Sequence, residues 1–468
     1  MKQKMQLLFI APFLMLALLI ACKKSNSSSS GSSSATITSL TCASATFSAT
    51  AAINTAYSGT ASVPYTGGNG VAYSAGTAIS STGVTGLTAT LQAGTLASGA
   101  GSLVYSISGT PTSSGTAAFA ISFGGQSCSL SLTVSATTVD CSSATGVAKV
   151  VCLANAFLAT LSTTQQAAVV QTLNLTNAKL WSNLPCGLSC RDGIAFSSLT
   201  TTQLAAALAV IQAAAGTTTD EGYSEFYQIN QSDSMLGVAS GNTSSYSKGN
   251  YIICFLGTPS ATGKWMLQYG GHHYAANITY NAGSVVSITP SHQGIEPKSW
   301  TTAGGTVVAP MASEVSAMAN MLASFTSTEL ASAKVSSTFS DVLMVPGSTT
   351  NTFPGTKQGI QVSTLSAAAQ AKVLAAMAPW INDMDATSAA AFTTLYTNEL
   401  ASTYVCYGSN TSGVSGTASS FFTTNTDYVR IDGPSVWIEF ICQTGVVYPS
   451  QIHYHSVFRD HTRDYIGL

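Results

Sequence analysis

Charged side chains are the scarcest feature of this 468-residue chain. Asp, Glu, Lys and Arg make up 7% of the residues and leave a formal net charge of −2, against about 25% charged residues in average soluble domains. No charged residue occurs from Ser25 to Val139. Nucleic-acid binding needs a basic patch or stripe, so we expect no nucleic-acid partner.

Long apolar runs are also missing, except at the N-terminus. There, two lysines precede an apolar run of about fifteen residues, which suits a signal peptide and is short for a membrane span. The run ends in Leu19-Ile20-Ala21-Cys22 and resembles the lipobox of bacterial lipoproteins. The resemblance implies that residues 1–22 are a lipoprotein signal peptide and that Cys22 anchors the exported protein in the membrane. Because Lys23 follows, it also implies sorting to the outer membrane. A plain secretory signal with a chance cysteine is the alternative.

Glycine, serine and threonine dominate the next part of the chain. Residues 23–35 are a Ser/Gly linker that cannot bury a core. Residues 36–137 hold short alternating apolar runs between turn residues, which predict an all-β antiparallel sandwich. The stretch YSISGTPTSSGTAAFAISFGGQSCSLSLTV resembles bacterial immunoglobulin-like modules, and in such a module Cys42 and Cys128 would form a disulfide. We expect a spacer, or a module that binds a sugar or surface.

Charges and helical periodicity begin at Asp140. Four segments share an apolar lead, a Ser/Thr cap and an Ala-rich amphipathic run. Three of them carry a capping box, at Ser162/Gln165, Thr200/Gln203 and Thr326/Glu329. Strands are expected at 251–256, 264–269, 273–280, 285–289, 428–431, 436–442 and 452–458. We therefore predict that residues 138–468 form a larger α+β domain with an antiparallel sheet and amphipathic helices.

The chain has ten cysteines. An exported protein favours disulfides, and the nine that remain once Cys22 carries lipid leave at least one thiol unpaired. Cys186 and Cys190 would form a local bridge or belong to two longer ones. Cys254 and Cys442 lie in apolar strands, where a thiol is inert or bridged.

Four motifs of the second region occur together: PSATGKWMLQYGGHHYAANITY, SVVSITPSHQGIEP, YVRIDGPSVWIEF and HYHSVFRDHTRDYIG. In this order they resemble a bacterial family of unknown function, family 3500. The resemblance implies a shared α+β fold and no established reaction. Six residues match the family's motif positions, namely Gly271, His272, His273, His453, His455 and Arg459. The Asp-His-Gln that members often carry is here Ile441-Cys442-Gln443, which leaves a role for that histidine in doubt.

All six histidines fall in two windows, 272–292 and 453–461. His453 and His455 alternate on one expected strand and therefore share a face. In the first window, a hairpin that turns at 282–283 would place His273 opposite His292, with their Cβ atoms about 4.5–5.5 Å apart. His272 then faces the other side, unless a bulge or a proline changes the pairing.

Imidazole is the commonest protein ligand for transition metals. Two or three histidines with a carboxylate would leave one coordination position open. We therefore expect His272, His273, His453 and His455 to supply ligands to Zn, Cu or Fe. A metal-free polar site and purely structural pairing of the histidines are the alternatives.

Three further side chains are candidates for catalysis. Glu439 interrupts the apolar strand VWIEFIC, where an unpaired charge is expensive, and Glu296 follows the histidine hairpin. Arg459 would orient an anionic or carbonyl-bearing ligand. Alternatively, Glu439 pairs with Arg430 or Arg459.

Other catalytic templates are missing: no Gly-x-Ser-x-Gly elbow lies on a strand-to-helix turn, and no phosphate-binding loop occurs. The expected function is that of a lipid-anchored cell-envelope protein whose histidine site supports metal-assisted hydrolysis or oxidation, with an unknown small molecule, glycan or peptide as ligand. The alternative is a surface protein that binds a glycan, a peptide or an envelope partner without turnover. Its sugar-stacking residues would be Trp265, Tyr269, Tyr274, Trp300 and Trp437, although aromatic residues on strands usually belong to the core.

Overall fold

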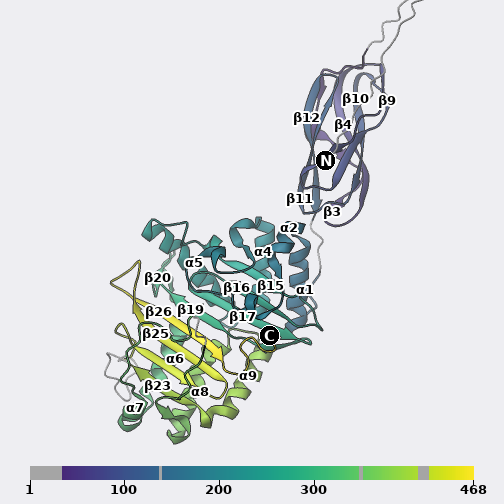
Figure 1. Cartoon of the computed structure of the whole chain (residues 1–468). Coiled ribbons are helices and arrows are strands. Elements are labelled where there is room, and N and C mark those ends of the chain that lie inside the picture. Colours follow the sequence, from purple (N-terminus) through teal and green to yellow (C-terminus); the bar gives the residue numbers. More distant parts are fainter. Residues whose placement is uncertain (1–33, 136–139, 347–351, 409–420) are drawn as a thin grey trace, which may run out of the picture.

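The computed structural model describes residues 34–135, 140–346, 352–408 and 421–468. The expected signal peptide with Cys22, and nearly all of the expected linker, lie outside these residues. Figure 1 shows the N-terminal strands gathered apart from a larger part in which helices and a broad sheet pack together. Among the described helices, none has both the length and the apolar character that crossing a membrane requires.

The N-terminal region contains two main sheets. One has the order β1-β4-β10-β8-β6 and is built on β4 (Tyr57–Asn69) and β10 (Ser98–Gly109). The other has the order β3-β12-β11-β7 and is built on β11 (Gly115–Phe123) and β12 (Gln126–Ser135). The shorter strands are β1 (Ser39–Leu40), β3 (Ala51–Ala52), β6 (Ile79–Ser80), β7 (Thr82–Gly83) and β8 (Leu87–Leu91). Alternate side chains of both sheets meet in one hydrophobic core because successive strand residues point to opposite faces. The predicted Cys42–Cys128 disulfide is present.

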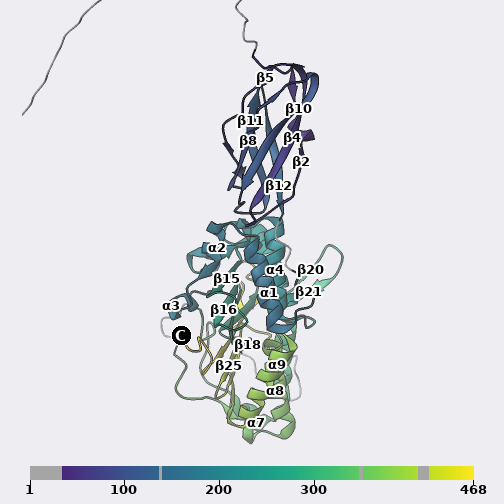
Figure 2. The ribbon, with the colours of Figure 1, turned by 90° about the vertical axis from the view of Figure 1, so that its right-hand side faces the viewer.

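One twelve-stranded sheet runs through the described part of the C-terminal region, in the order β13-β15-β16-β17-β19-β26-β25-β24-β23-β22, with β14 beside β15 and β18 beside β17. Its short strands are β13 (Val170–Gln171), β14 (Ile194–Ala195), β18 (Ser284–Ser287) and β22 (Ile360–Gln361). Its main strands are β15 (Ile252–Leu256), β16 (Trp265–Gly270), β17 (Tyr274–Asn281), β19 (Ser291–Ile295), β23 (Tyr404–Gly408), β24 (Tyr428–Asp432), β25 (Val436–Thr444) and β26 (Ile452–Asp460). Helices pack on one face over the larger core, and Figure 2 shows α1, α8 and α9 along that side. A smaller core lies on the other face, largely under loops.

The C-terminal region consists of two halves with the same order of elements. In the first half, helices α1 (Gly146–Ala159), α2 (Thr163–Val169), α4 (Thr201–Ala215) and α5 (Tyr223–Ser240) precede β15, β16, β17 and β19. In the second half, helices α6 (Ala312–Ala323), α7 (Ser327–Ala333), α8 (Ala367–Ile381) and α9 (Ala386–Glu399) precede β23 to β26. Because β19 and β26 are neighbours at the centre of the sheet, the strands follow in the same order outward on either side.

The strand register repeats between the halves as well. The edge pairs correspond, since Val170 lies beside Phe255 as Lys334 lies beside Tyr407, both in parallel. The hairpins correspond, since Gly270 opposes Ala275 as Asp432 opposes Trp437. The central strands correspond, since Tyr274 opposes Gln293 as Val436 opposes Asp460. The region is therefore an internal duplication around a pseudo-twofold axis between β19 and β26.

The predicted capping boxes are confirmed, at the N-termini of α2, α4 and α7. The duplication explains the shared shape of the four helix starts. Ser162 and Thr326 cap the equivalent helices α2 and α7, and Thr200 and Ser366 cap the equivalent helices α4 and α8.

The cysteines divide into bridged and buried ones. The Cys186–Cys190 bridge is local, and a further disulfide joins Cys141 to Cys152, which the sequence did not predict. Cys254, Cys406 and Cys442 are free and buried, which confirms the expectation of an unpaired thiol. Burial raises the pKa of each of these thiols, that of Cys406 to about 11, so they are poor nucleophiles.

Candidate metal centre

His272 and His273 form the tight turn between β16 and β17, whereas the sequence predicted a strand that begins at His273. The Gly271 N–H donates to the Tyr274 carbonyl across the turn at 2.8 Å. His273 has a φ of 68°, a left-handed conformation that costs about 1–2 kcal/mol for a residue with a side chain. Residues in such conformations persist where their surroundings hold them.

Three hydrogen bonds hold the turn's backbone: Arg191 Nη2 to Gly271 O (2.7 Å), Tyr251 Oη to His272 O (2.5 Å) and His273 N to Asn183 O (2.9 Å). Arg191 is buried and also donates to the carbonyls of Ser182, Leu184 and Gly187 and to Cys186 Sγ, in and just before the loop that the Cys186–Cys190 bridge closes. Burial lowers its pKa to about 10. The segment 182–191 therefore works as a clamp that fixes the histidine turn.

The predicted register of the first window was wrong. Asn281 does pair with Ser284 as expected, but the register shifts between Thr279 and Tyr280. The pairing moves by one further residue between Ser287 and Ser291, so His292 opposes Ala275 rather than His273. The prediction that His272 faces away was wrong too, because the rings of His272 and His273 stack with centroids 3.7 Å apart.

Three imidazoles meet beside this turn. Nitrogen atoms of His273, His453 and His455 all lie within 4.8 Å of one another, and the Nε2 atoms of His273 and His453 are 2.8 Å apart. His453 and His455 lie on β26, where the expected alternation places both rings on one face, with centroids 4.4 Å apart. The three residues are 1%, 4% and 8% exposed.

A glycine on the central strand makes room for these rings. Gly294 of β19 lies opposite His455 in the sheet. A Cβ atom at this position would lie 2.9 Å from His455 Cδ2 and 3.2 Å from His273 Cδ2. Any larger residue would therefore push two of the three imidazoles. Sequence reasoning missed this glycine because its importance depends on the strand register.

Two aspartates orient histidines of the cluster. Asp341 Oδ1 lies 3.0 Å from His455 Nδ1, and Asp233 Oδ1, on α5, lies 2.6 Å from His272 Nδ1. The first contact leaves His455 Nε2 as the nitrogen available to a ligand. Carboxylates hold metal-binding histidines in this way by accepting from the second ring nitrogen. No local sequence signal marks either aspartate, since Asp233 and Asp341 lie 39 and 114 residues from their partners.

The surroundings keep the central imidazoles neutral. Burial, followed by repulsion from the neighbouring histidines, lowers the pKa of His273 and His453 well below the usual value. His292, whose ring lies 5.0 Å from that of His455, has its pKa lowered to about 3, mainly by burial. Only a neutral imidazole has a lone pair to offer a metal.

The structure gives Glu439 a different set of partners. Its carboxylate accepts from the backbone N–H groups of Leu343 (2.6 Å) and Met344 (3.1 Å), and from Trp437 Nε1 and Tyr428 Oη at 2.7 Å each. Among the described residues it is not in the group of ligand atoms around the histidines. Glu439 holds the segment that carries Asp341, and so acts on the cluster through that segment.

Glu296 and Arg459 are likewise buried and engaged. Glu296 Oε1 accepts from the backbone N–H groups of Val447 (2.8 Å) and Tyr448 (2.6 Å). Arg459 donates to Asp464 and to the Met344 carbonyl. Like Glu439, both fix loops on the face of the sheet that carries the histidines.

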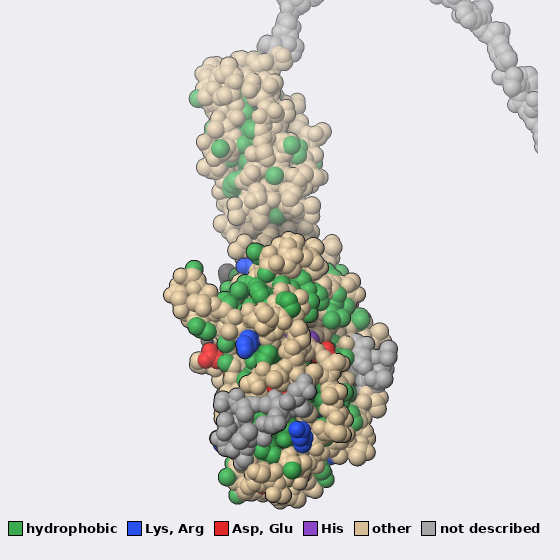
Figure 3. All heavy atoms as spheres, turned by 90° about the vertical axis from the view of Figure 1, so that its left-hand side faces the viewer, with side chains coloured by type: hydrophobic (Ala, Val, Ile, Leu, Met, Phe, Trp, Pro, Cys, Tyr) green, Lys and Arg blue, Asp and Glu red, His purple; other side chains and the backbone are tan. Residues whose placement is uncertain are grey.

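The cluster has little access to solvent. Figure 3 shows a small histidine area next to acidic atoms, among backbone and uncharged side chains. The side chains that reach solvent are His272, at 11% exposed, His455, at 10% exposed, and Asp341, at 37% exposed. A ligand would therefore enter along this narrow opening.

Comparison with known proteins identifies the C-terminal region. Residues 143–467 match the model of the family described as "Protein of unknown function (DUF3500)", so the chain belongs to that family. This confirms the resemblance of the four motifs. No curated protein and no solved structure matches the chain.

Proposed function

We propose that this DUF3500 protein binds a divalent transition metal (Zn, Cu or Fe) through His273, His453 and His455. The observation that carries the proposal is the approach of three buried imidazoles within 4.8 Å, from elements 180 residues apart in the chain. Gathering three histidines in an apolar interior has no benefit for packing. It does create the donor set that these metals prefer.

The donor set fits such an ion. A zinc ion binds imidazole nitrogens at about 2.0–2.1 Å, so nitrogens that share it lie about 3.3 Å apart in a tetrahedral site. The spacings in the cluster, from 2.8 Å up to 4.8 Å, bracket this value. Three protein nitrogens would leave one position open for water or substrate.

The residues around the trio have distinct tasks. Asp341 fixes the ring of His455, and Asp233 fixes His272, which stacks on His273. The clamp at 182–191 fixes the backbone of the turn. A metal held there would activate a bound water for hydrolysis or take part in oxidation.

Exposed apolar side chains on the segments that hold the site indicate the kind of substrate. Leu184 and Leu188 are 58% and 48% exposed on the clamp, Leu343 is 40% exposed beside Asp341, and Val446 is 71% exposed on the loop that Glu296 binds. Exposed apolar groups that gather on one face mark binding sites. We therefore propose a small molecule or peptide with an apolar part as substrate.

Ligand capture without turnover remains the alternative. The aromatic residues that could stack on a sugar do not favour a glycan, because Trp265, Tyr269, Tyr274 and Trp437 are buried. An assay that finds the metal but no turnover of peptides or esters would support this alternative.

We further propose that the protein is an outer-membrane lipoprotein, anchored through Cys22, with an immunoglobulin-like module as its spacer. The lipobox at 19–22 and the disulfides of both regions support export. Labelling of cells with a palmitate analogue should mark the wild-type protein and not the Cys22→Ala variant. Labelling of both, or of neither, would contradict the anchor.

Metal analysis of the full chain purified without a histidine tag tests the metal site. We expect about one transition-metal ion per wild-type chain, and less than a tenth of that in His453→Ala with His455→Ala. His461→Ala is the matched control, because His461 contacts Asp432 instead, and it should keep the metal. Circular dichroism would confirm that each variant folds. A wild-type chain that stays metal-free after incubation with zinc would refute the proposal.

A further inference from the structure

Four carboxylates meet below the helices, on the opposite face of the sheet from the histidines. Glu221 and Glu225 lie before and within the start of α5, Glu314 lies on α6, and Asp383 joins α8 to α9. Ligand oxygens of Glu221, Glu225 and Asp383 lie within 4.8 Å of one another. Glu225 and Glu314 are 0% exposed and Glu221 is 7% exposed. None of the ion pairs formed by the described residues involves these four groups.

A buried amide is directed into the same cluster. Gln293, on β19, is 2% exposed and donates through Nε2 to Glu225 Oε2 and Asp383 Oδ2. Its Oε1 atom has no hydrogen-bond partner. Three buried carboxylate oxygens share this lack of a partner, namely Glu221 Oε2, Glu225 Oε1 and Glu314 Oε1. Buried polar atoms without a partner are rare and costly, so these oxygens point to a missing ligand.

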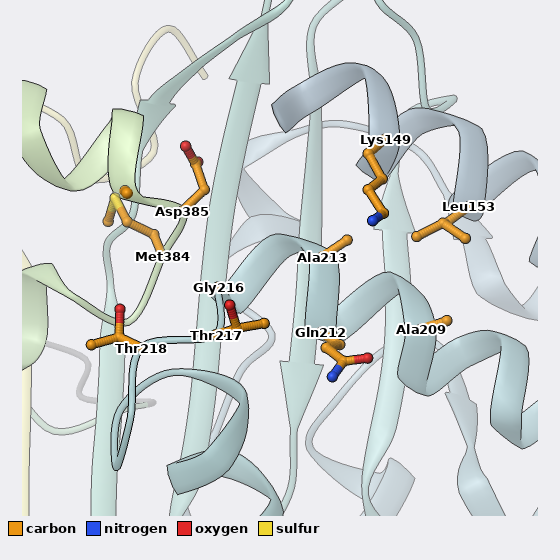
Figure 4. Close-up of a pocket in the computed structure, with 11 residues that line it drawn as sticks. Lys149, Leu153, Ala209, Gln212, Ala213, Gly216, Thr217, Thr218, Met384 and Asp385 are labelled. Carbon is orange, nitrogen blue, oxygen red and sulfur yellow. The ribbon is translucent and has the colours of Figure 1, made fainter. Parts of the chain in front are cut away.

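The cluster lies where the two halves of the C-terminal region cross. The Gly222 N–H donates to Asp383 Oδ1 at 2.7 Å, which joins the α4–α5 linker to the α8–α9 linker. A Cβ atom at Gly216 would lie 2.3 Å from the Met384 carbonyl oxygen. Figure 4 shows this crossing at a neighbouring pocket, with Gly216 and Thr217 near Met384 and Asp385. A ligand in the cluster would therefore tie both halves together.

A path leads to the cluster from solvent. A pocket of about 340 Å³ between α6 and α8 is lined by Glu221, Ser313, Asn320 and Lys372. Glu221 forms part of its wall, and a ligand oxygen of Glu221 lies within 4.8 Å of those of Glu225 and Asp383. An ion with a water shell could enter by this route and lose its waters to the carboxylates.

We propose that Glu221, Glu225, Glu314 and Asp383 form a calcium site, with the Gln293 amide oxygen as a further ligand after rotation of the amide. All available donors are oxygens, which suit hard cations rather than those that the histidines prefer. Calcium accepts six to eight oxygens in flexible geometry, whereas magnesium demands an octahedron and keeps most of its waters. A cage of several buried carboxylates therefore favours calcium.

The alternative is that the cluster holds protons instead of an ion. Burial, followed by mutual repulsion, raises the pKa of Glu221 to about 10 and that of Glu314 to about 8. Burial also raises the pKa of Asp383 to about 7. Without a cation the carboxyl groups would share protons through hydrogen bonds. A calcium ion would displace these protons, so the two states exclude each other.

Calorimetric titration of CaCl₂ into the chelator-treated full chain tests the proposal. We expect one binding event per chain, and a rise in Tm of roughly 5 °C at a calcium concentration of 100 Kd. Glu225→Gln with Asp383→Asn should lose both effects. Asp220→Asn is the matched control, because Asp220 is exposed on the same linker and loses one charge without touching the cluster. It should bind calcium like the wild type.

A variant of the histidine site separates this proposal from that of the histidine metal centre. His453→Ala with His455→Ala should keep calcium binding, so that failure of the histidine site and failure of this site are distinguishable. If the carboxylate variant does not fold, the wild-type titration alone decides. No heat and no change in Tm up to 10 mM CaCl₂ would overturn the proposal and leave shared protons as the explanation.

Discussion

The two halves of the C-terminal region build the same hairpin with different residues. The β16–β17 turn closes through Gly271 N to Tyr274 O at 2.8 Å, and the β24–β25 turn closes through Gly433 N to Val436 O at 2.7 Å. Between these ends the first turn holds His272-His273 and the second holds Pro434-Ser435. Because the second hairpin forms without histidine, the scaffold does not require the imidazoles. The comparison therefore favours a functional reason for them.

The helices behind the two turns repeat the comparison. Asp233 of α5 contacts His272, and Glu399 of α9 accepts from Ser435 N (2.9 Å) and Ser435 Oγ (2.8 Å). Each half thus directs a carboxylate to its turn. Only in the first half does the carboxylate meet an imidazole that stacks on a ligand candidate, His273.

The central strands differ in charge balance. Gln293 of β19 and Asp460 of β26 hold equivalent positions, by their pairing with Tyr274 and Val436. Asp460 accepts from Tyr396 Oη and faces Arg463 at 3.4 Å, within one half. Gln293 instead lies among carboxylates without a cation. Each cluster takes residues from both halves, and the first half supplies its residues without a chemical counterpart in the second, His273 and Gln293. Both clusters are candidates for ions.

Replacing His273 by serine, the residue at the equivalent position of the second half, should have the largest effect on metal binding. His273→Ser removes one of three nitrogens and keeps a residue that the equivalent turn tolerates. We expect zinc affinity to fall at least about 100-fold, because the loss of an outer-shell partner alone costs about 10–100-fold. Competition with a chromophoric chelator measures it. An unchanged affinity would show that the trio does not bind the metal.

Acid should destabilise the protein, because His292 gains a proton when the chain unfolds. Its pKa is lowered to about 3 in the folded protein, so below about pH 6.5 the unfolded chain binds more protons. Stability is therefore present above this pH and is lost as the pH falls toward 3. From pH 6.5 to 5 the metal-free wild type should lose about 2 kcal/mol more than His292→Gln.

Denaturant unfolding at both pH values checks this prediction, and the difference between the two proteins isolates His292. The groups that face it are His273, His455, His272 and Asp341. Burial acts to raise the pKa of Asp341, but its contacts with His455, His292 and the Val342 N–H together lower it below the usual value. The buried carboxyl groups below the helices, with raised pKa values, act in the opposite direction in both proteins. Equal losses would mean that His292 is protonated in the native state.

Removing the charge behind His455 should weaken metal binding without abolishing it. In Asp341→Asn the amide can still hold the imidazole but no longer increases its basicity. We expect about a tenfold loss of zinc affinity in the same chelator competition. Glu399→Gln, the corresponding change behind the second turn, should leave zinc affinity unchanged. Equal losses in both variants would point to a general effect on folding.

The smallest effect is expected from a substitution in the β24–β25 turn. Ser435→Ala removes one hydroxyl hydrogen bond to Glu399, which costs about 1 kcal/mol of unfolding free energy, and should not change metal content. Thermal unfolding and metal analysis of the same sample check both parts. A loss of metal would show that the two turns are coupled, and would contradict the claim that only the β16–β17 turn serves the metal site.

Much of this architecture was predictable from local patterns. The capping boxes, the alternation of His453 and His455 and the two strand groups depend on neighbours along the chain, and so they can be read in sequence. The partners Asp233, Asp341 and Gly294 could not be found this way, because each meets the histidines only through the strand register or a distant loop. The register itself was wrong because the pairing shifts by one residue within the β17–β18 pair and by one more before β19, which moves every later pair.

The duplication escaped prediction for a similar reason. Its halves share hydrogen-bond registers while the residues differ, as in Gln268 opposite Asn277 and Arg430 opposite Glu439. Cross-strand pairs of such different charge conceal a common geometry. The repeated helix caps were its only visible trace.

X-ray absorption spectroscopy of the zinc-loaded full chain tests the central claim most directly, because it reports the atoms bound to the metal. Three imidazole nitrogens at about 2.0–2.1 Å, reduced to two in His273→Ser, are the predicted result. A first shell without imidazole, or one made of oxygen alone, would contradict the assignment of the histidine trio as a metal centre.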